Sequence, residues 1–275
     1  MSLKNEFIKM IMNLNSNFAI PLIADIFLPP FYEGGQPKNA QFMAVFLEDG
    51  ATGISYILVP VKKMEAYNAL RPQDFIGKKP QEFALEFGNE DPVRKMISLA
   101  SINAICQHVM KETNLQLDYV TDPLGLLSVE KGDRIGMVGL FSGLTDTIMN
   151  AGAELIIIEK KEHLIQKFQA LPITTDVTQL ATCNKILCTG TTVLNNSLDE
   201  ILSHCSPDAF VSVVGPTAGY FPEPLFACGV DVVGGRVVKD SKEFQQRLNQ
   251  GKRWTNTTLK TCFQKKTYRS IMSIG

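Results

Sequence analysis

Small and acidic residues follow strand-like apolar runs at four places in the C-terminal half of the sequence. In "ILCTGTTVLNNSLDEIL" (residues 186–202), the apolar run stops at residues 189–192, and apolar residues then recur at helical spacing. Residues 195–197 are types that favour a helix N-cap, and Asp199 and Glu200 suit the positive end of a helix. A strand, a turn and a helix start in this order predict free backbone N–H groups that could hold an anionic or carbonyl-bearing ligand.

The other three places supply more small residues and one carboxylate. They are residues 139–143, Glu159 and residues 215–218. Ligands of open α/β sheets gather at the carboxyl ends of the strands, so we expect all four segments to line one site. Glu159 lies 20 positions after Gly139, about where dinucleotide and adenosyl folds place the acid that binds a ribose diol. It is the candidate hydrogen-bond acceptor or catalytic base.

The predicted ligand-binding residues come mainly from these segments. They are Gly139, Phe141, Glu159, Thr189, Gly190, Thr191, Thr192, Asn195, Gly215, Pro216 and Thr217, joined by Asn103 from the N-terminal half. An alternative explanation is that the glycines form tight turns and pack against helices, while the threonines cap a turn. Asn103 lies among small residues in a helical segment, where a buried amide is either a structural clip, which we favour, or a group that faces a cleft.

The sequence lacks the familiar motifs for nucleotide cofactors and metals. Its glycine pattern is "GMVGLFSG" (136–143) rather than G-x-G-x-x-G, and Phe141 is bulky where a pyrophosphate would need room. Cys183 and Cys188 straddle one strand, and His204 and Cys205 end a helix, without C-x-x-C or H-E-x-x-H spacing. We therefore predict no NAD site, and no metal site built from the chain's own side chains.

The composition describes a chain that can bury a core and carries little net charge. Of its 275 residues, 45% are hydrophobic and 20% are charged, with a formal net charge of −1. This balance gives no general attraction to nucleic acid or to an anionic membrane. No apolar run approaches the roughly 20 residues that span a bilayer, and "MSLKNEFIKMIMNLNSNF" reads as an ordinary first helix rather than a signal peptide. Because the six cysteines are scattered like reduced core residues, we expect a cytoplasmic protein.

The order of the predicted strands and helices that must position these residues changes along the chain. Residues 1–113 read as three consecutive strands followed by helices, an α+β domain, with strands at 18–30, 41–49 and 52–60 and helices at about 62–70, 80–87 and 92–112. Residues 114–275 alternate strands with helices, with strands at 133–141, 154–160, 183–189, 209–216 and 230–238. The alternation predicts a Rossmann-like α/β domain with five mainly parallel strands and helices on both faces.

Two further segments bear on partners. The helix at 92–112 and the apolar "YFPEPLFACG" (220–229) offer packing surfaces, from which we predict a homodimer. The basic tail after Gly251 is read as a C-terminal strand or arm in preference to a lid over an anionic ligand.

Several motifs together resemble one known family. The segments "IGKKPQEFALEF", "GMVGLF", "LIIIEK", "LCTGTTVLNNSLDEIL" and "VVGPTAGYFPEPLFACGVDVVGGRVV" are similar to those of the heavy-metal chelation domain family, over roughly residues 15–250. The resemblance implies an enolase-N-terminal-like domain leaning on a Rossmann-like domain, with a cleft between them. By position, residues 189–192 and Asn195 match the family's TGTT motif, Gly215 and Pro216 the next loop, and Glu159 the acid after the second strand. Enolase chemistry is not implied, because its catalytic residues lie mainly in a barrel that this chain lacks.

The resemblance implies a ligand such as a pterin, a tetrapyrrole, a siderophore-like chelator or its metal complex. Since the residues offer no cage of cysteine and histidine, any metal ion would be brought by the chelating ligand. The favoured hypothesis is a cytoplasmic protein that binds a small polar molecule in the interdomain cleft, with condensation, hydrolysis or group transfer left open. The alternatives are a non-catalytic carrier or sensor of a metal or metal–chelator complex, and a nucleotide fold of the S-adenosylmethionine type.

Overall fold

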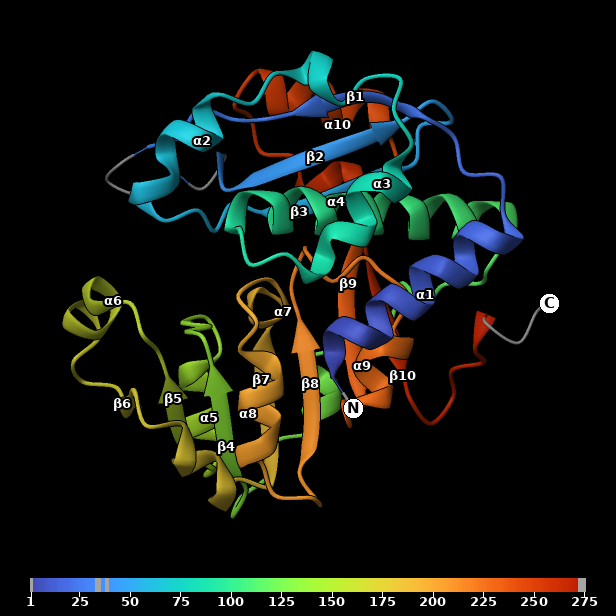
Figure 1. Cartoon of the computed structure of the whole chain (residues 1–275). Coiled ribbons are helices and arrows are strands. Elements are labelled where there is room, and N and C mark those ends of the chain that lie inside the picture. The colour runs from blue at the N-terminus through green and yellow to red at the C-terminus, as the bar shows by residue number, and fades with distance from the viewer. Residues whose placement is uncertain (1, 33–35, 38–39, 272–275) are drawn as a thin grey trace.

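The computed structural model describes residues 2–32, 36–37 and 40–271, whose strands form a three-stranded sheet and a seven-stranded sheet. Figure 1 shows the small sheet in an upper body and the large sheet in a lower body, with the long helix α4 (Pro92–Glu112) between them. The two sheets are separate, as predicted from the switch between consecutive strands and alternating strands and helices in the sequence.

The upper body is built on an antiparallel meander. Its strands are β1 (Ile23–Phe27), β2 (Phe42–Leu47) and β3 (Thr52–Tyr56), in that spatial order. The tight turn between β2 and β3 contains Gly50 with φ of 81°, a conformation that glycine adopts without strain. Helix α1 (Leu3–Asn17) precedes the meander, and the short helices α2 (Met64–Asn68) and α3 (Pro80–Ala84) follow it.

Helix α4 is covered on all sides along most of its length. It begins where the Asp91 carboxylate accepts hydrogen bonds from the backbone N–H groups of Val93 and Arg94. Residues 95–110 are all buried. On one side the helix packs on β3 so closely that a Cβ at Gly53 would overlap the carbonyl oxygen of Ala100. The small residues of this helix therefore serve close packing inside one chain.

The lower body contains the seven-stranded sheet in the order β10-β9-β8-β7-β4-β5-β6. Six of these strands run parallel, and β10 pairs antiparallel with β9. The strands are β4 (Arg134–Val138), β5 (Glu154–Ile158), β6 (Ile173–Thr174), β7 (Lys185–Thr189), β8 (Phe210–Val214), β9 (Val232–Val238) and β10 (Thr258–Gln264). The five predicted strands are correct, whereas β6 is too short to leave a sequence pattern and β10 comes from the basic tail.

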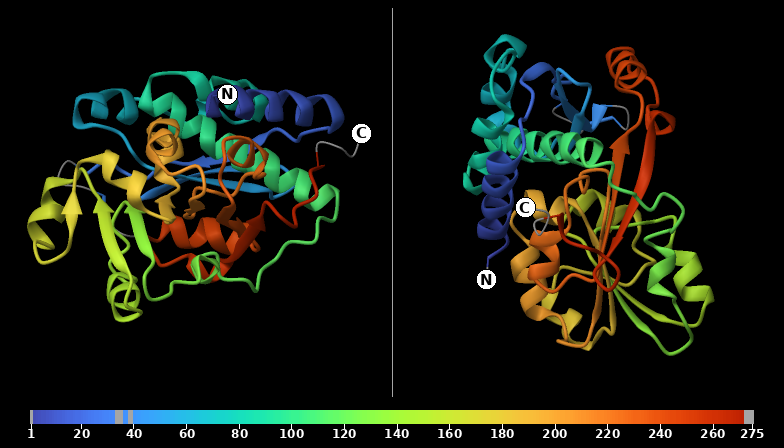
Figure 2. Two further views of the ribbon diagram at one scale, coloured as in Figure 1. Left: turned by 90° about the horizontal axis from the view of Figure 1, so that it is seen from below. Right: turned by 90° about the vertical axis from the view of Figure 1, so that its right-hand side faces the viewer.

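Helices cover both faces of this sheet, as the right-hand view of Figure 2 shows, with α5 on one face and α8 and α9 on the other. They are α5 (Thr145–Asn150), α6 (Glu162–Lys167), α7 (Thr191–Leu194), α8 (Leu198–His204) and α9 (Glu223–Ala227). The single helix expected from about residue 195 is wrong in detail. A short helical turn already begins at Thr191, and the main helix begins at Leu198 because Asn196 adopts a φ of 61° between the two.

The last helix belongs with the upper sheet in space, although it follows β9 in sequence. Helix α10 (Ser241–Asn249) packs Phe244 and Leu248 against Phe46 and Trp254 in one buried cluster. Figure 1 places α10 behind the upper strands. The chain therefore returns from the lower body to the upper body and then comes back along β10.

The surfaces on which the homodimer prediction rests are covered within one chain. Tyr220 and Phe221 are fully buried, and the Tyr220 ring meets the edge of Phe7 from α1 at 4.9 Å between ring centroids. Helix α4 is likewise enclosed. The homodimer stays a prediction, without support from these two segments. Among the described helices, none combines the length and apolarity needed to cross a bilayer.

Candidate functional site

A cavity of about 340 Å³, here called the inner chamber, lies between the two bodies at the carboxyl ends of β4, β5, β7 and β8. Phe42, Tyr56 and Leu58 from the upper body line its other side. All but two of the predicted ligand-binding residues line this chamber. They are Gly139, Phe141, Glu159, Thr189, Thr191, Thr192, Asn195, Gly215, Pro216 and Thr217.

The two predicted residues that do not line the chamber have structural contacts instead. A Cβ at Gly190 would lie 2.9 Å from Oγ1 of Thr217, so this glycine lets the β7 and β8 loops approach each other. The Asn103 side chain donates from Nδ2 to the carbonyl oxygens of Ile54 (2.7 Å) and Thr217 (2.9 Å). Asn103 thus joins the upper sheet to a loop of the chamber, which is the arrangement expected of a structural clip.

Glu159 uses most of its hydrogen-bonding capacity on the backbone. Its Oε1 accepts from the N–H groups of Lys160 and Lys161, both at 2.9 Å, and its Oε2 accepts from Leu140 N at 3.3 Å. A carboxylate has about four acceptor positions, so roughly one is left. A ribose diol would donate two hydrogen bonds, which this carboxylate is poorly placed to accept. Glu159 therefore fixes the loop after β4 to the end of β5.

The threonines of the TGTT segment bond to one another and to the backbone. The Oγ1 atoms of Thr189 and Thr191 lie 3.1 Å apart, and Thr192 donates from Oγ1 to the carbonyl oxygen of Thr189 at 2.8 Å. These contacts tighten the turn into α7. The hydroxyl groups still border the chamber, so a ligand can reach their remaining lone pairs.

The expected row of free backbone N–H groups is wrong at several positions. Gly139 N donates to Ile158 O, Gly190 N to Val214 O and Gly215 N to Gly234 O, all between 2.8 and 2.9 Å. These residues continue the ladder of the parallel sheet for one step past the strand ends, and that step uses the donors. Recognition in the chamber must therefore rest on side chains more than on a cradle of amides.

Those side chains include an aromatic and a cationic set that sequence reasoning missed. Lys161 Nζ lies 5.7 Å from the centroid of the Tyr56 ring, within the range of a cation–π contact. The Phe42 ring meets Tyr56 edge to face at 5.4 Å. Lys160 and Lys161 directly follow Glu159, which is a signal that could have found them. Nothing in the sequence shows that Phe42 and Tyr56 come to lie over the lower sheet.

The inner chamber opens into a larger one. A cavity of about 1110 Å³, here called the outer chamber, shares Tyr56, Leu58, Lys161, Leu164 and Asn195 with the inner chamber. Its far wall comes from the segment between β3 and α2 and from the start of α4. Its basic lining residues are Lys62, Lys63, Lys95, Lys161 and His163, and its acidic ones are Glu90 and Asp91.

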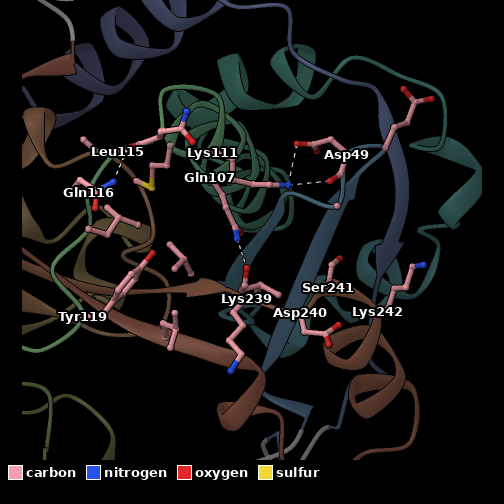
Figure 3. Close-up of a pocket in the computed structure, with 18 residues that line it drawn as sticks. Asp49, Gln107, Lys111, Leu115, Gln116, Tyr119, Lys239, Asp240, Ser241 and Lys242 are labelled. Carbon is pink, nitrogen blue, oxygen red and sulfur yellow. Dashed lines mark hydrogen bonds and ion pairs between the residues drawn. The ribbon is translucent and has the colours of Figure 1, made fainter.

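A third cavity, of about 910 Å³, lies at the other end of α4. Figure 3 shows Lys111 reaching Asp49, and Gln107 donating to the carbonyl oxygen of Val238. His108 Nδ1 also lies 3.0 Å from Asp49, while the Gln107 side-chain oxygen accepts from Thr52 N. The polar groups at its centre are thus paired within the protein, and we assign it no ligand.

The described residues contain no group of three or more histidine, cysteine, aspartate or glutamate side chains able to hold a metal ion. The cysteines are free thiols. Burial raises the pKa of Cys205 and of Cys262 to about 11, and it raises the pKa of Cys106 and Cys188 further. Thiols held in the protonated form are poor metal ligands, since the thiolate is the ligand.

Comparison with known proteins assigns both bodies to one family. A family model described as "Putative heavy-metal chelation" (DUF364) matches residues 122–266, and a second model with the same description (DUF4213) matches residues 40–106. The chain belongs to this heavy-metal chelation family. The two matches supply opposite walls of the inner chamber, because Phe42 and Tyr56 lie in one and the strand ends of the lower sheet lie in the other.

Two solved structures of the heavy-metal chelation family share this fold. A DUF364-family protein of unknown function from Pyrococcus horikoshii is 18% identical, with a TM-score of 0.69 over 95% of this chain and 99% of that chain. A protein of unknown function from the same family in Desulfitobacterium hafniense is 17% identical, with a TM-score of 0.67 over 94% of this chain and 98% of that chain. At these identities the likeness shows the fold. A comparison with curated proteins found no match.

Proposed function

We propose that the chain binds a small, planar, anionic molecule of the metal-chelating kind in the cleft formed by the inner and outer chambers. The observation that carries the proposal is the pair of rings of Tyr56 and Phe42 opposite the strand ends, with Lys161 from the end of β5 against the Tyr56 ring. Aromatic faces stack on flat ring systems, and the lysines attract negative charge. The inner chamber is near the lower end of the usual size range for small-ligand sites. It suits a fused ring of pterin size, whereas a tetrapyrrole would have to extend into the outer chamber.

Binding is better supported than catalysis. The carboxylate of Glu159 accepts three backbone N–H groups, and the threonine hydroxyls contact each other. A general base needs a free lone pair within reach of the proton that it removes, and Glu159 keeps roughly one acceptor position for this, with its other three used by the backbone. A carrier or sensor needs only complementary shape and charge. We therefore favour a carrier or sensor, to which a metal ion comes with the ligand, and we expect it to act in the cytoplasm.

Native mass spectrometry with elemental analysis of freshly purified protein tests whether a ligand and a metal co-purify. A fluorescence titration with pterin-6-carboxylate, with and without Fe³⁺, then measures binding directly. Tyr56→Leu, which keeps bulk and removes the ring, should weaken binding. Tyr119→Leu, which alters the third cavity, should not. Equal affinity of the wild type and Tyr56→Leu would refute the proposed site, and S-adenosylmethionine serves as the competing ligand.

A further inference from the structure

Lys95 is a buried amine in the wall of the outer chamber. It lies in the first turn of α4, and its residue is only 3% exposed. Its Nζ sits over the ring of Phe87, 4.8 Å from the ring centroid. Among the residues that the structure describes, no oxygen accepts a hydrogen bond from this amine and no carboxylate forms an ion pair with it.

Another lysine of the same wall, Lys63, shows the contrast. Lys63 Nζ lies 2.7 Å from a carboxylate oxygen of Asp91, and both side chains are partly exposed. Around Lys95, the charges of Glu90, Lys4 and Asp199 act from a greater distance without contact. Burial is the largest influence and lowers the pKa of Lys95 to about 8. Among the residues that the structure describes, the Phe87 ring is thus the only group in contact with the charge of this largely buried amine.

We infer that the outer chamber is an oxyanion subsite, in which Lys95 pairs with a carboxylate or phosphate group of the bound molecule. An oxyanion there supplies the hydrogen-bond acceptor that the described part of the chain does not, and buried charge pairs of this kind form short, strong contacts. Lys62 and Lys161 line the same chamber and add positive charge. Of the two acidic lining residues, Asp91 is shared between Lys63 and the start of α4, so that Glu90 is the main opposing charge.

This inference rests on the proposed function and narrows it. The ligand would have two parts, which are a flat ring in the inner chamber and an acidic arm that reaches Lys95 in the outer chamber. The residues common to both chambers, such as Tyr56 and Asn195, make the two spaces continuous. Polycarboxylate and phosphorylated chelators fit this description, whereas a neutral ring without an arm uses only half of the cleft.

Calorimetric titration of the full chain with citrate and with tripolyphosphate tests the subsite. Lys95→Met keeps the apolar stem over Phe87 and removes the charge, and Lys95→Arg keeps the charge. Lys239→Met, which borders the third cavity, is the matched control. We expect one of the two probes to bind the wild type, about tenfold or more weaker binding in Lys95→Met, since a charge-assisted contact is lost, and near wild-type binding in the other two variants. The probe that binds identifies the arm as carboxylate or phosphate.

The inference is overturned if neither probe binds the wild type or if Lys95→Met binds as well as Lys239→Met. A parallel titration with unsubstituted pterin, which has no acidic arm, separates the two proposals. Pterin binding without oxyanion binding rejects the subsite and keeps the ring site. Oxyanion binding through Lys95 without pterin binding keeps the subsite and rejects the ring. Melting curves of each variant confirm that the protein titrated is folded.

Discussion

The side-chain amide of Asn103 donates a hydrogen bond to the backbone carbonyl of Thr217 across 2.9 Å, and so helix α4 holds a loop of the inner chamber. The same nitrogen donates to Ile54 in the upper sheet. One buried amide therefore bonds to both bodies beside the inner chamber.

Replacing this amide should loosen the cleft. Asn103→Leu has a similar volume but leaves two buried carbonyl oxygens without their donor, which costs about 1–3 kcal/mol each when nothing replaces it. We expect a lower free energy of unfolding in urea, and weaker binding of pterin-6-carboxylate by the protein that remains folded. Asn249→Ala, at the end of α10, is the control. Unchanged stability in Asn103→Leu would show that ordered water replaces the amide.

Glu159→Gln should act on stability more than on affinity. The amide nitrogen of glutamine faces backbone N–H groups that need an acceptor, so at least one of the three contacts is lost. The expected cost is about 1–3 kcal/mol, which corresponds to a fall of several degrees in Tm for a chain of this size. Glu162→Gln at the start of α6 is the control. If affinity disappears while Tm holds, the carboxylate contacts the ligand directly.

Gly190 is predicted to affect the stability of the protein through its close approach to Thr217. The added methyl group of Gly190→Ala would meet Thr217 Oγ1 at 2.9 Å, closer than such contacts allow, and should lower the Tm. Thr217→Ala removes that oxygen, so the double variant should recover part of the loss. Thermal melts of the four proteins in a double-mutant cycle measure the coupling. Additive effects would mean that the methyl group disturbs something other than Thr217.

Lys95 predicts a pH dependence with opposite signs for binding and for stability. Its pKa is lowered from 10.5 to about 8, so the folded protein loses this proton first. Oxyanion affinity should fall as pH rises through about 8. Between about pH 8 and 10.5 the unfolded chain binds more protons at this site, and the free energy of unfolding should therefore rise relative to Lys95→Met.

Glu90, Lys4 and Asp199 are the other charged groups that influence this amine. Denaturant titrations of the wild type and of Lys95→Met at pH 7, 8, 9 and 10 would isolate its contribution. A difference between the two proteins that does not change with pH contradicts the assignment.

Metal alone should have little effect on stability. The described residues offer no cluster of ligands, and the buried thiols resist deprotonation. We expect Zn²⁺ or Ni²⁺ without a chelator to leave the Tm unchanged, whereas a metal–chelator complex should raise it by mass action. A Tm rise with the bare ion would point to ligands supplied by the protein itself.

The clustering of candidate site residues at the carboxyl ends of the large sheet's strands could be predicted from the sequence, because parallel strands place these ends together. That rule brings residues 139–141, Glu159 and the three threonines of residues 189–192 to one cavity without knowledge of any distance. The rule does not say which backbone donors stay free. Gly139, Gly190 and Gly215 each donate to a neighbouring strand, and this depends on where each ladder ends.

The residues that the upper body contributes to the opposite wall of the cleft could not be predicted from the sequence in this way. Phe42 and Tyr56 alternate in ordinary strands, and only the docking of one sheet over the other turns them toward the lower body. Lys95 looks like a solvated residue of a helix start, and its burial follows from the approach of Phe87 and the neighbouring elements. Such features arise from contacts between segments far apart in sequence, which periodicity does not encode.

The path of the chain around β9 limits how the cleft can move. The chain passes from the upper body to the lower one before β4, returns through β9 to α10, and comes back along β10. A buried apolar cluster also runs through both bodies, from Phe7 and Leu99 to Val213 and Val233. Two bodies joined by a single linker can rotate about it and close on a ligand. The two bodies of this chain are joined by three crossings and share a core, so we expect them to resist such rotation. Entry to the cleft would then depend on side chains at the junction of the two chambers, such as Lys161, and not on rotation of one body against the other.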